Sequence, residues 1–159
     1  MSVDRQSEEQ EWADNPRLNA WLAKQEAAFP GWTQQSGQAW DFTPGSLDQL
    51  EDLLRRQFST WEEVSAAQED PIVAVSAWYL GEVQNRHYGT VWHCNPQLPM
   101  NHPDQDGTPF VLMPEDPRDE YEEDDDERYR PGNNPFVEIR ALFVRGPENR
   151  LRDVLNRYR

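Results

Sequence analysis

The sequence is poor in cysteine and lysine, since Cys94 and Lys24 are the single examples of each among 159 residues. One cysteine excludes an intramolecular disulfide, so a packed core must stabilise the fold. No stretch approaches the roughly 20 consecutive apolar residues that span a membrane. The opening residues, MSVDRQSEEQEW, also lack the apolar run of a secretory signal peptide. These absences predict a soluble, cytoplasmic protein.

Basic residues are scarce as well, because 15 Lys and Arg face 30 Asp and Glu, which leaves a net charge of −15. Nucleic acids and anionic membranes are bound largely through Lys and Arg. The charge therefore argues against both as direct partners. It favours a basic protein partner, or serves only to keep the protein in solution.

Aromatic residues are plentiful, with seven Trp, six Phe and five Tyr spread along the chain. They supply the apolar surface of a core, and the length suits one domain, which typically has about 100–200 residues. We expect residues 1–13 to form a flexible polar N-terminus. Residues 14–159 are expected to form a single domain.

Three helices are expected in the first half of the sequence. The first begins at Asn15 and Pro16, which suit a helix cap and a first helical position, and ends at Pro30-Gly31. The second opens after Thr43, because Ser46 and Gln49 have the spacing of a capping box. Its apolar stripe consists of Leu47, Leu50, Leu54 and Phe58.

A second capping-box pattern, Thr60 with Glu63, predicts a short helical turn. The third main helix runs from about Asp70 to Tyr88 and is apolar on nearly every side through its first half. Such a helix belongs in the middle of a core. Gly81 inside this helix costs up to about 1 kcal/mol relative to alanine, so it predicts a close neighbour.

Short apolar runs predict strands at residues 90–94, 110–113 and 136–144, and residues 148–158 predict a short helix. Segments rich in Pro, Asp and Gly between the first strands predict loops. Helices segregated from strands indicate an α+β fold. We expect three N-terminal helices packed on a small, mostly antiparallel sheet of about three strands, with a short C-terminal helix.

Two segments of the sequence carry a resemblance: DFTPGSLDQLEDLL (Asp41–Leu54) and WYLGEVQNRHYGTVW (Trp78–Trp92). In this order and at a similar separation, they resemble segments of uncharacterised bacterial domains. Some of those domains look like the small cytoplasmic immunity proteins found beside polymorphic toxins. The resemblance covers about residues 41–94 and supports the helix–glycine–strand unit. It implies no reaction, because those domains have no established active site.

The strongest compositional signal is the acidic run at residues 115–127, which holds ten carboxylates and one arginine. One interpretation is a loop that is only solvated. Calcium binding is conceivable, but the run lacks the spacing of an EF-hand loop. Part of the run could also fold back on the last 32 residues, which have a net charge of +5.

The interpretation that gives the acidic run a function is electrostatic attraction of a basic partner. Its tyrosines would serve as aromatic anchors, since such residues often dominate binding. The residues expected to bind the partner are Glu120, Tyr121, Glu122, Glu123, Asp124, Asp125, Asp126 and Tyr129.

Glu82 lies on the most apolar helix, and Arg86 follows it four residues later. The simplest interpretation is an ion pair on one helix face. The alternative is a pocket between this helix and the sheet, in which Glu82, Arg86, Trp92 and His93 would contact a ligand or a substrate.

His87, His93, Cys94 and His102 are the soft metal ligands of the sequence. Zinc requires three or four converging ligands, whereas His93 and Cys94 would point to opposite faces of a strand. A Cys94–histidine nucleophile is formally possible, but a half-buried structural cysteine is the simpler interpretation. No phosphate-loop, dinucleotide-binding, serine-hydrolase or metalloprotease motif is present. We therefore expect no metal, no cofactor and no catalytic residue.

The leading hypothesis is a non-enzymatic protein that binds and neutralises a basic partner, as immunity and antitoxin proteins do. A negative surface would speed association with the partner and then cover its working site. Two alternatives stay open: a small-ligand-binding or enzymatic domain, and a structural or self-assembling protein. The oligomeric state stays open with them.

Overall fold

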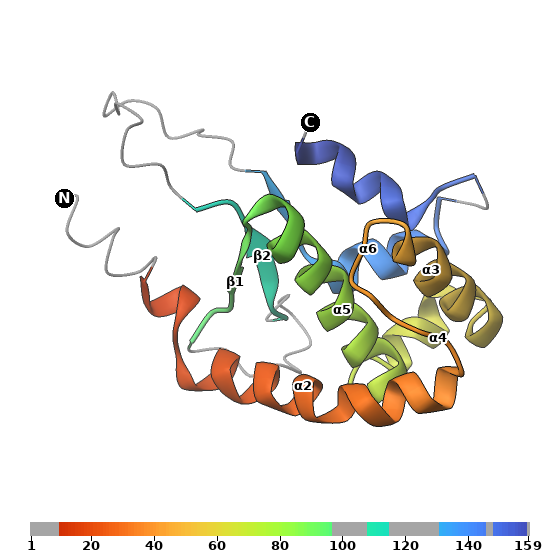
Figure 1. Ribbon diagram of the computed structural model, residues 1–159, viewed down its shortest axis with the longest axis horizontal. Coiled ribbons are helices and arrows are strands. Elements are labelled where there is room, and N and C mark those ends of the chain that lie inside the picture. Colours follow the sequence, from red (N-terminus) through yellow and green to blue (C-terminus); the bar gives the residue numbers. More distant parts are fainter. Residues whose placement is uncertain (1–9, 97–107, 115–130, 146–147, 159) are drawn as a thin grey trace.

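The structure is a computed structural model that describes residues 10–96, 108–114, 131–145 and 148–158 (Figure 1). Within these ranges it has an α+β fold, which confirms the expected fold class. None of the helices in these ranges has the length and apolar character needed to cross a membrane. The helices are α2 (Pro16–Ser36), α3 (Ser46–Gln57), α4 (Trp61–Ala66), α5 (Pro71–Tyr88), α6 (Pro135–Ala141) and the 3-10 helix η1 (Leu151–Tyr158). The strands are β1 (Val91–His93), β2 (Phe110–Leu112) and β3 (Gly132–Asn133).

The three strands form one antiparallel sheet in the order β1-β2-β3. Trp92 pairs with Val111, and Val111 pairs in turn with Asn133 on the other side. Val111 is completely buried at the centre of the sheet. The expectation of a small antiparallel sheet is therefore confirmed, and β2 is its central strand.

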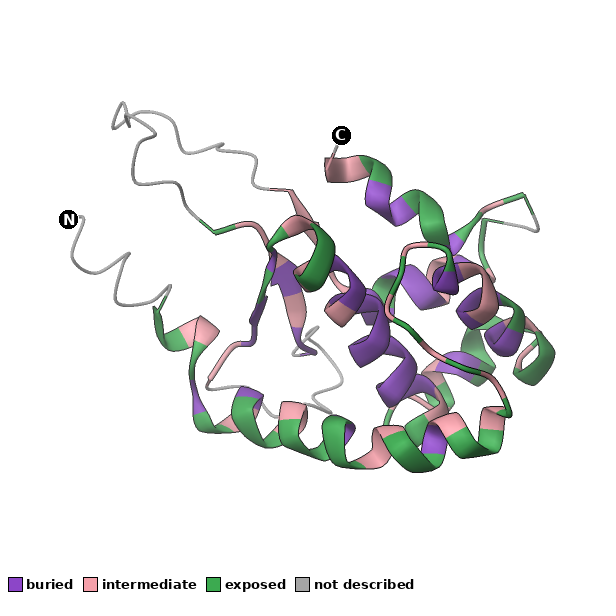
Figure 2. Cartoon of the chain, in the orientation of Figure 1, coloured by how far each residue is buried: buried purple, intermediate pink, exposed green. Residues whose placement is uncertain are grey.

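Helix α5 is the central element of the core, and every residue from Val73 to Leu80 is buried (Figure 2). Helices α2, α3 and α6 pack against it, and so do β1 and β2. A helix that is apolar all round needs neighbours on every side, which explains this central position. Gly89 ends the helix with φ of 80°, in the left-handed region that glycine adopts most easily.

Helix α2 continues past Pro30-Gly31, so the stop predicted there is wrong. A proline inside a helix removes one backbone hydrogen bond, but aromatic packing around it offsets this loss. The ring of Phe29 stacks on Trp32 at a centroid distance of 5.7 Å, and Trp32 lies 4.6 Å from Trp40. The helix ends instead at Gly37, whose φ is 68°.

The capping box expected at Ser46 is not formed, whereas the helix predicted at Thr60 is present with Thr60 as its cap. The residue at the cap of α3 is Gly45, which has no side chain, and the Thr43 hydroxyl accepts the backbone N–H of Ser46 at 3.3 Å. The Ser46 hydroxyl lies instead 2.6 Å from the hydroxyl of Tyr79 on α5. At α4 the Thr60 hydroxyl accepts a hydrogen bond from the backbone N–H of Glu63 at 3.2 Å.

The strand predicted at residues 136–144 is wrong, because residues 135–141 form α6 and the third strand is β3 just before it. The side chain of Asn134 caps the helix by accepting the N–H of Phe136 at 3.0 Å. Pro135 follows at the first helical position, where proline is favoured. The apolar residues of this run also have helical spacing, and those buried are Phe136, Ile139 and Leu142.

The predicted C-terminal helix is present as the 3-10 helix η1. Its apolar residues Leu151, Val154 and Leu155 are buried. The Leu151 N–H donates to the Glu51 carboxylate on α3 at 2.7 Å, and Arg55 lies 3.1 Å from the same carboxylate. Because Glu51 is only 2% exposed, these partners replace the water it lost on folding.

Of the N-terminal segment 1–13, the structure describes residues 10–13, which are helical. The Trp12 carbonyl accepts the backbone N–H of Cys94 at 2.9 Å. The Trp12 ring packs edge-on against Phe110 at 6.2 Å. These contacts join the start of the described chain to the sheet.

Candidate partner-binding site

The strands on either side of the acidic run in the sequence, β2 and β3, pair with each other. Leu112 at the end of β2 lies opposite Gly132 at the start of β3. Next to this pair, the Met113 N–H donates to the Pro131 carbonyl at 2.9 Å. The residues expected to bind a partner, from Glu120 to Tyr129, lie outside the described residues. The described residues that flank the segment, Met113 and Pro131, therefore lie next to each other.

Arg157 binds β3, the strand that follows the acidic run in the sequence. Its Nη1 donates to the Gly132 carbonyl at 3.0 Å, and its Nη2 pairs with the Glu138 carboxylate at 2.6 Å. Glu138 is only 7% exposed, so it needs a charged partner. A Cβ at residue 132 would overlap the carbonyl of Val111, so glycine is required at this close approach of the strands.

Asn133 on β3 is tied to the core by a network of three polar side chains. The Gln84 amide on α5 donates to Asn133 Oδ1 at 3.2 Å, and the Tyr158 hydroxyl donates to Gln84 Oε1 at 2.5 Å. The Tyr158 ring also stacks on Tyr88 at 4.7 Å. Gln84 is completely buried, and a buried network whose members are satisfied makes a structure rigid. Strand β3 is therefore anchored to α5 and η1.

Most of the negative charge belongs to residues outside the described ranges. The described residues hold 15 carboxylates and 10 Lys or Arg, a net charge of −5, against −15 for the whole sequence. Arginines of the basic C-terminal region have acidic partners on α3 and α6. The pairs are Arg150 with Glu51, Arg152 with Asp48 and Arg157 with Glu138. These three arginines thus have acidic partners within the described residues.

Three of the four residues considered for a pocket lie together at the end of α5. Arg86 Nη2 lies 3.5 Å from Glu82 Oε1, so the expected ion pair is present. The indole N–H of Trp92 donates to Glu82 Oε2 at 2.9 Å, and the Trp92 ring fills the space beside Gly81. The Arg86 guanidinium lies 3.6 Å over the ring of Phe42, a cation–π contact. Each of these side chains thus has a structural partner.

His93, the fourth residue considered for the pocket, follows Trp92 on β1. Neighbouring residues of a strand project to opposite faces, so His93 lies on the other face of the sheet. Its ring stacks on Phe110 at 5.5 Å, and its Nδ1 is 2.8 Å from the Val91 carbonyl. The structure therefore brings Glu82, Arg86 and Trp92 together and places His93 apart from them.

Of the other candidate metal ligands, the structure describes His87 and Cys94. His87 Nε2 lies 2.9 Å from the Phe42 carbonyl, and His102 is outside the described residues. Cys94 is buried, and burial raises the pKa of its thiol, which disfavours the reactive thiolate. In the ranges that the structure describes, no three His, Cys, Asp or Glu side chains gather at metal-binding distance.

Tyr79 joins the two segments of the resemblance, and the sequence predicted no role for its hydroxyl. Its hydroxyl accepts the Phe42 N–H at 2.8 Å and lies 2.6 Å from the Ser46 hydroxyl. Burial raises the pKa of Tyr79. The available signal was a tyrosine in an otherwise apolar buried helix, because a buried phenol hydroxyl needs a hydrogen-bond partner.

The turn before α3 holds Phe42 in an unusual conformation. Its φ is 60°, in the left-handed region that aromatic residues seldom adopt. The Asp41 carboxylate accepts both the hydroxyl of Thr43 at 2.7 Å and its backbone N–H at 3.1 Å. These hydrogen bonds lower the pKa of Asp41. The DFT sequence is thus a structural turn that places Phe42 under Arg86.

Comparison with known proteins gives no relative: no family model, no curated protein and no solved structure matches this chain. The resemblance of residues 41–94 to bacterial immunity-like domains therefore stays a prediction.

Proposed function

We propose that this is a non-enzymatic cytoplasmic protein that captures a basic protein partner through its acidic segment, in the manner of an immunity protein. The observation that carries the proposal is the attachment of this segment. Residues 115–127 carry ten carboxylates and one arginine, and both ends join strands that are hydrogen-bonded to each other. In this proposal the negative charge of the segment acts from the place where β2 and β3 pair.

The physical mechanism is electrostatic steering followed by local docking. A concentrated negative charge attracts a cationic surface over about a Debye length, roughly 8–10 Å at physiological salt. Such steering raises association rates by about 10–10³-fold. In this proposal Glu120 and the carboxylates of 122–126 provide the field, and Tyr121 and Tyr129 provide aromatic anchors.

The rest of the chain serves as the scaffold in this proposal. The three N-terminal helices packed on the small sheet, with the short C-terminal helix, keep the two attachment points of the segment together. Arg157 and the Gln84–Asn133–Tyr158 network support this role, because they connect β3 to α5 and α6. Closing a segment at its base also lowers the entropy that it loses on binding.

The contacts of Glu82 favour this proposal over a catalytic one. Its two carboxylate oxygens have partners in Arg86 and Trp92. A general base must instead reach the proton of a substrate in a site that admits the substrate. Glu82 has the contacts of a residue that fixes β1 on α5.

The experiment is a capture from native cells at low and high salt with three forms of the full chain. The first is the wild type. The second replaces Glu120, Glu122, Glu123, Asp124, Asp125 and Asp126 by Gln or Asn. The third is a control that removes the same number of exposed carboxylates elsewhere: Glu26, Asp52, Glu62, Glu69, Glu148 and Asp153.

The proposal predicts that the wild type and the control retain the same basic protein at low salt and release it at high salt. The variant with a neutral segment should retain little of it. Equal retention by the neutral-segment variant would show that this segment does not bind the partner. Circular dichroism of all three forms tests whether a difference arises from unfolding.

A further inference from the structure

The first described residues lie at the outer edge of the sheet, next to the end of β1. Figure 1 shows the start of the described chain beside the residues that follow β1, on the side opposite β2. The Cys94 N–H donates to the Trp12 carbonyl at 2.9 Å, and the Asn15 side-chain amide donates to the Cys94 carbonyl at 3.0 Å. Neighbouring antiparallel strands exchange such a pair of hydrogen bonds. Trp12 and Asn15 thus supply to Cys94 the two bonds that a further strand would supply.

Two further contacts fasten the same N-terminal residues to the sheet. The Arg17 guanidinium donates to the Asn95 carbonyl, one residue beyond the bonds just described. The Trp12 ring packs edge-on against Phe110 of β2 at a centroid distance of 6.2 Å. Residues 10–17 are therefore called the strap, because they run across the end of β1 and contact the chain on both sides of it.

The strap is held by polar contacts more than by buried apolar surface. Asn15 is the buried residue among residues 10–17, and Trp12, the largest apolar side chain there, is half-buried. The first buried apolar residue of the described chain is Leu18, which is completely buried. Segments with few buried apolar contacts open at a lower free energy than the core. The strap should therefore open more easily than the elements that follow it.

An open strap would leave a sheet edge without its hydrogen bonds. The N–H and C=O groups of Trp92 face the same side as those of Cys94, because alternate residues of a strand direct these groups to the same side. An edge with unpaired N–H and C=O groups is a template for a strand of another chain. In a two-fold dimer one surface meets its own copy, so a second molecule brings a matching edge.

We propose that the strap is a detachable cover that opens while the core stays folded, and that the edge it uncovers pairs with the same edge of a second copy of this chain. With the strap closed, Cys94 has its hydrogen bonds within one molecule and the second copy is excluded. With the strap open, β1 of one copy lies beside β1 of the other. Neither step involves the acidic segment or its partner.

Opening of the strap is measured by hydrogen exchange of the full chain, followed by NMR at urea concentrations below the unfolding transition. The Cys94 N–H reports on the strap, and the Leu80 N–H, in the buried part of α5, reports on the core. Local opening exposes little surface, so exchange at Cys94 should depend weakly on urea, whereas exchange at Leu80 should accelerate steeply. An equally steep urea dependence at both positions would overturn the proposal, because the strap would then open only when the whole chain unfolds.

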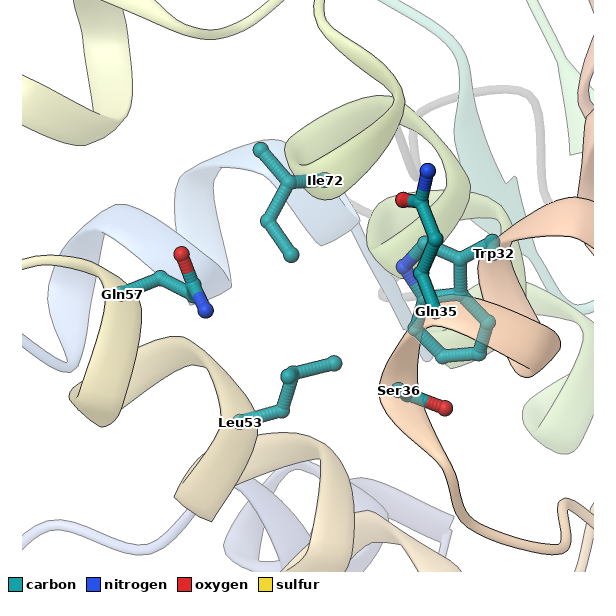
Figure 3. A pocket seen from close by; sticks show the side chains of 6 residues that line it. All are labelled: Trp32, Gln35, Ser36, Leu53, Gln57 and Ile72. Atoms are coloured by element: carbon teal, nitrogen blue, oxygen red, sulfur yellow. The ribbon is translucent and has the colours of Figure 1, made fainter.

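Two variants separate the strap from the core. Trp12→Ala removes the ring contact with Phe110 and should quicken exchange at Cys94 by about tenfold, the factor expected for the loss of one aromatic contact. Leu53→Ala is the control, because Leu53 lines a hollow at the other end of α2 (Figure 3) and its truncation weakens the core. It should quicken exchange at Leu80 and leave exchange at Cys94 unchanged. A Cys94 rate that responds to Leu53→Ala and not to Trp12→Ala would contradict a separate strap.

Pairing with a second copy is measured by sedimentation velocity over a wide range of protein concentration. Trp12→Ala should form dimers at lower concentration than the wild type. Adding Val91→Lys should return this variant to the monomer, because a charged side chain on an edge strand blocks pairing. Adding Val137→Lys instead is the matched control, since Val137 lies on α6 and is 37% exposed, against 38% for Val91. This control should leave the dimer in place.

Two results would overturn the pairing. The first is a Trp12→Ala variant that dimerises no more than the wild type. The second is an equal effect of the two lysine substitutions, which would mean that added charge acts in general and not at the edge of β1. If Trp12→Ala does not fold, Arg17→Met takes its place in both measurements, because it removes the bond to the Asn95 carbonyl.

Discussion

The Trp92 ring on β1 lies directly against Gly81 on α5, so close that a Cβ at residue 81 would overlap the ring. The same indole donates its N–H to Glu82 at 2.9 Å. Two successive helix residues therefore hold one tryptophan, the first by lacking a side chain and the second by accepting a hydrogen bond. This contact connects the sheet to the central helix.

The first prediction concerns this contact. Gly81→Ala should destabilise the protein by about 1–3 kcal/mol, the usual cost of overpacking a core. Gly31→Ala is the control, because Gly31 lies inside α2 and an added Cβ meets nothing within 4 Å. It should stabilise the protein by about 0.5–1 kcal/mol. Urea unfolding measures both changes, and a harmless Gly81→Ala would contradict the contact.

The second prediction concerns the hydroxyl of Tyr79. Tyr79→Phe leaves the Phe42 N–H and the Ser46 hydroxyl without this partner. The expected loss of stability is about 1–3 kcal/mol, typical for a buried polar group left unsatisfied. Tyr88→Phe removes a hydroxyl from the same helix, where the ring stacks on Tyr158, and should have a much smaller effect. Thermal unfolding of the two variants compares them, and equal losses would argue against the role of Tyr79.

The third prediction concerns alkaline pH. Burial raises the pKa of the Cys94 thiol above its ordinary value of 9.0, so the folded state holds this proton more tightly than the unfolded state. The stability that this gives is fully present below pH 9 and is lost as the pH rises through the folded pKa. The slope from one such group is at most about 1.4 kcal/mol per pH unit.

The variant Cys94→Ala isolates this effect from other groups that titrate in alkali. Its stability should fall less steeply than that of the wild type above pH 9, because the thiol has been removed. Denaturant unfolding at several pH values between neutral pH and pH 10.5 provides the comparison. Parallel curves for the two proteins would mean that the Cys94 thiol has the same pKa in both states.

The fourth prediction concerns the anchor of the acidic segment. Arg157→Met leaves Glu138 buried without its charged partner and should cost about 3–5 kcal/mol. Adding Glu138→Gln should restore part of that stability, because no uncompensated charge then remains. Hydrogen exchange of the Met113 N–H, which bonds to Pro131, should quicken in Arg157→Met. Slow exchange in that variant would show that Arg157 does not support the base.

The sequence predicted those elements whose signals were local and mutually consistent. The apolar faces of α5, the glycine at its end and the helix cap at Thr60 all agreed with the final fold. Gly81 predicted a close neighbour, and Trp92 is that neighbour. At each of these positions, a specific physical requirement favours the residue type that is found there.

The errors arose where tertiary packing overrode a local signal. Pro30 normally ends a helix, yet the packing of Phe29 and Trp32 on α5 residues carries α2 through it. The run at 136–144 has both strand and helix spacing, and the cap at Asn134 decided in favour of α6. Long-range hydrogen bonds, such as the one from Arg157 to the Gly132 carbonyl, cannot be predicted from the neighbouring residues of the sequence.

The sequence predicted the negative charge of the candidate site. It did not predict which strands lie on either side of it. Composition alone located the acidic run, because ten carboxylates in residues 115–127 stand out in any sequence. The pairing of β2 with β3 at both ends of the run could not be foreseen, since Gly132 and Asn133 have no strand pattern.

The most direct test of the proposed function is the association rate with the captured basic partner, measured by stopped flow across a range of ionic strength. The wild type should associate fast at low salt, and its rate should fall steeply as salt increases. Neutralising the six carboxylates between Glu120 and Asp126 should slow association at low salt by about tenfold or more and flatten this dependence. An unchanged rate and an unchanged salt dependence in that variant would contradict the account.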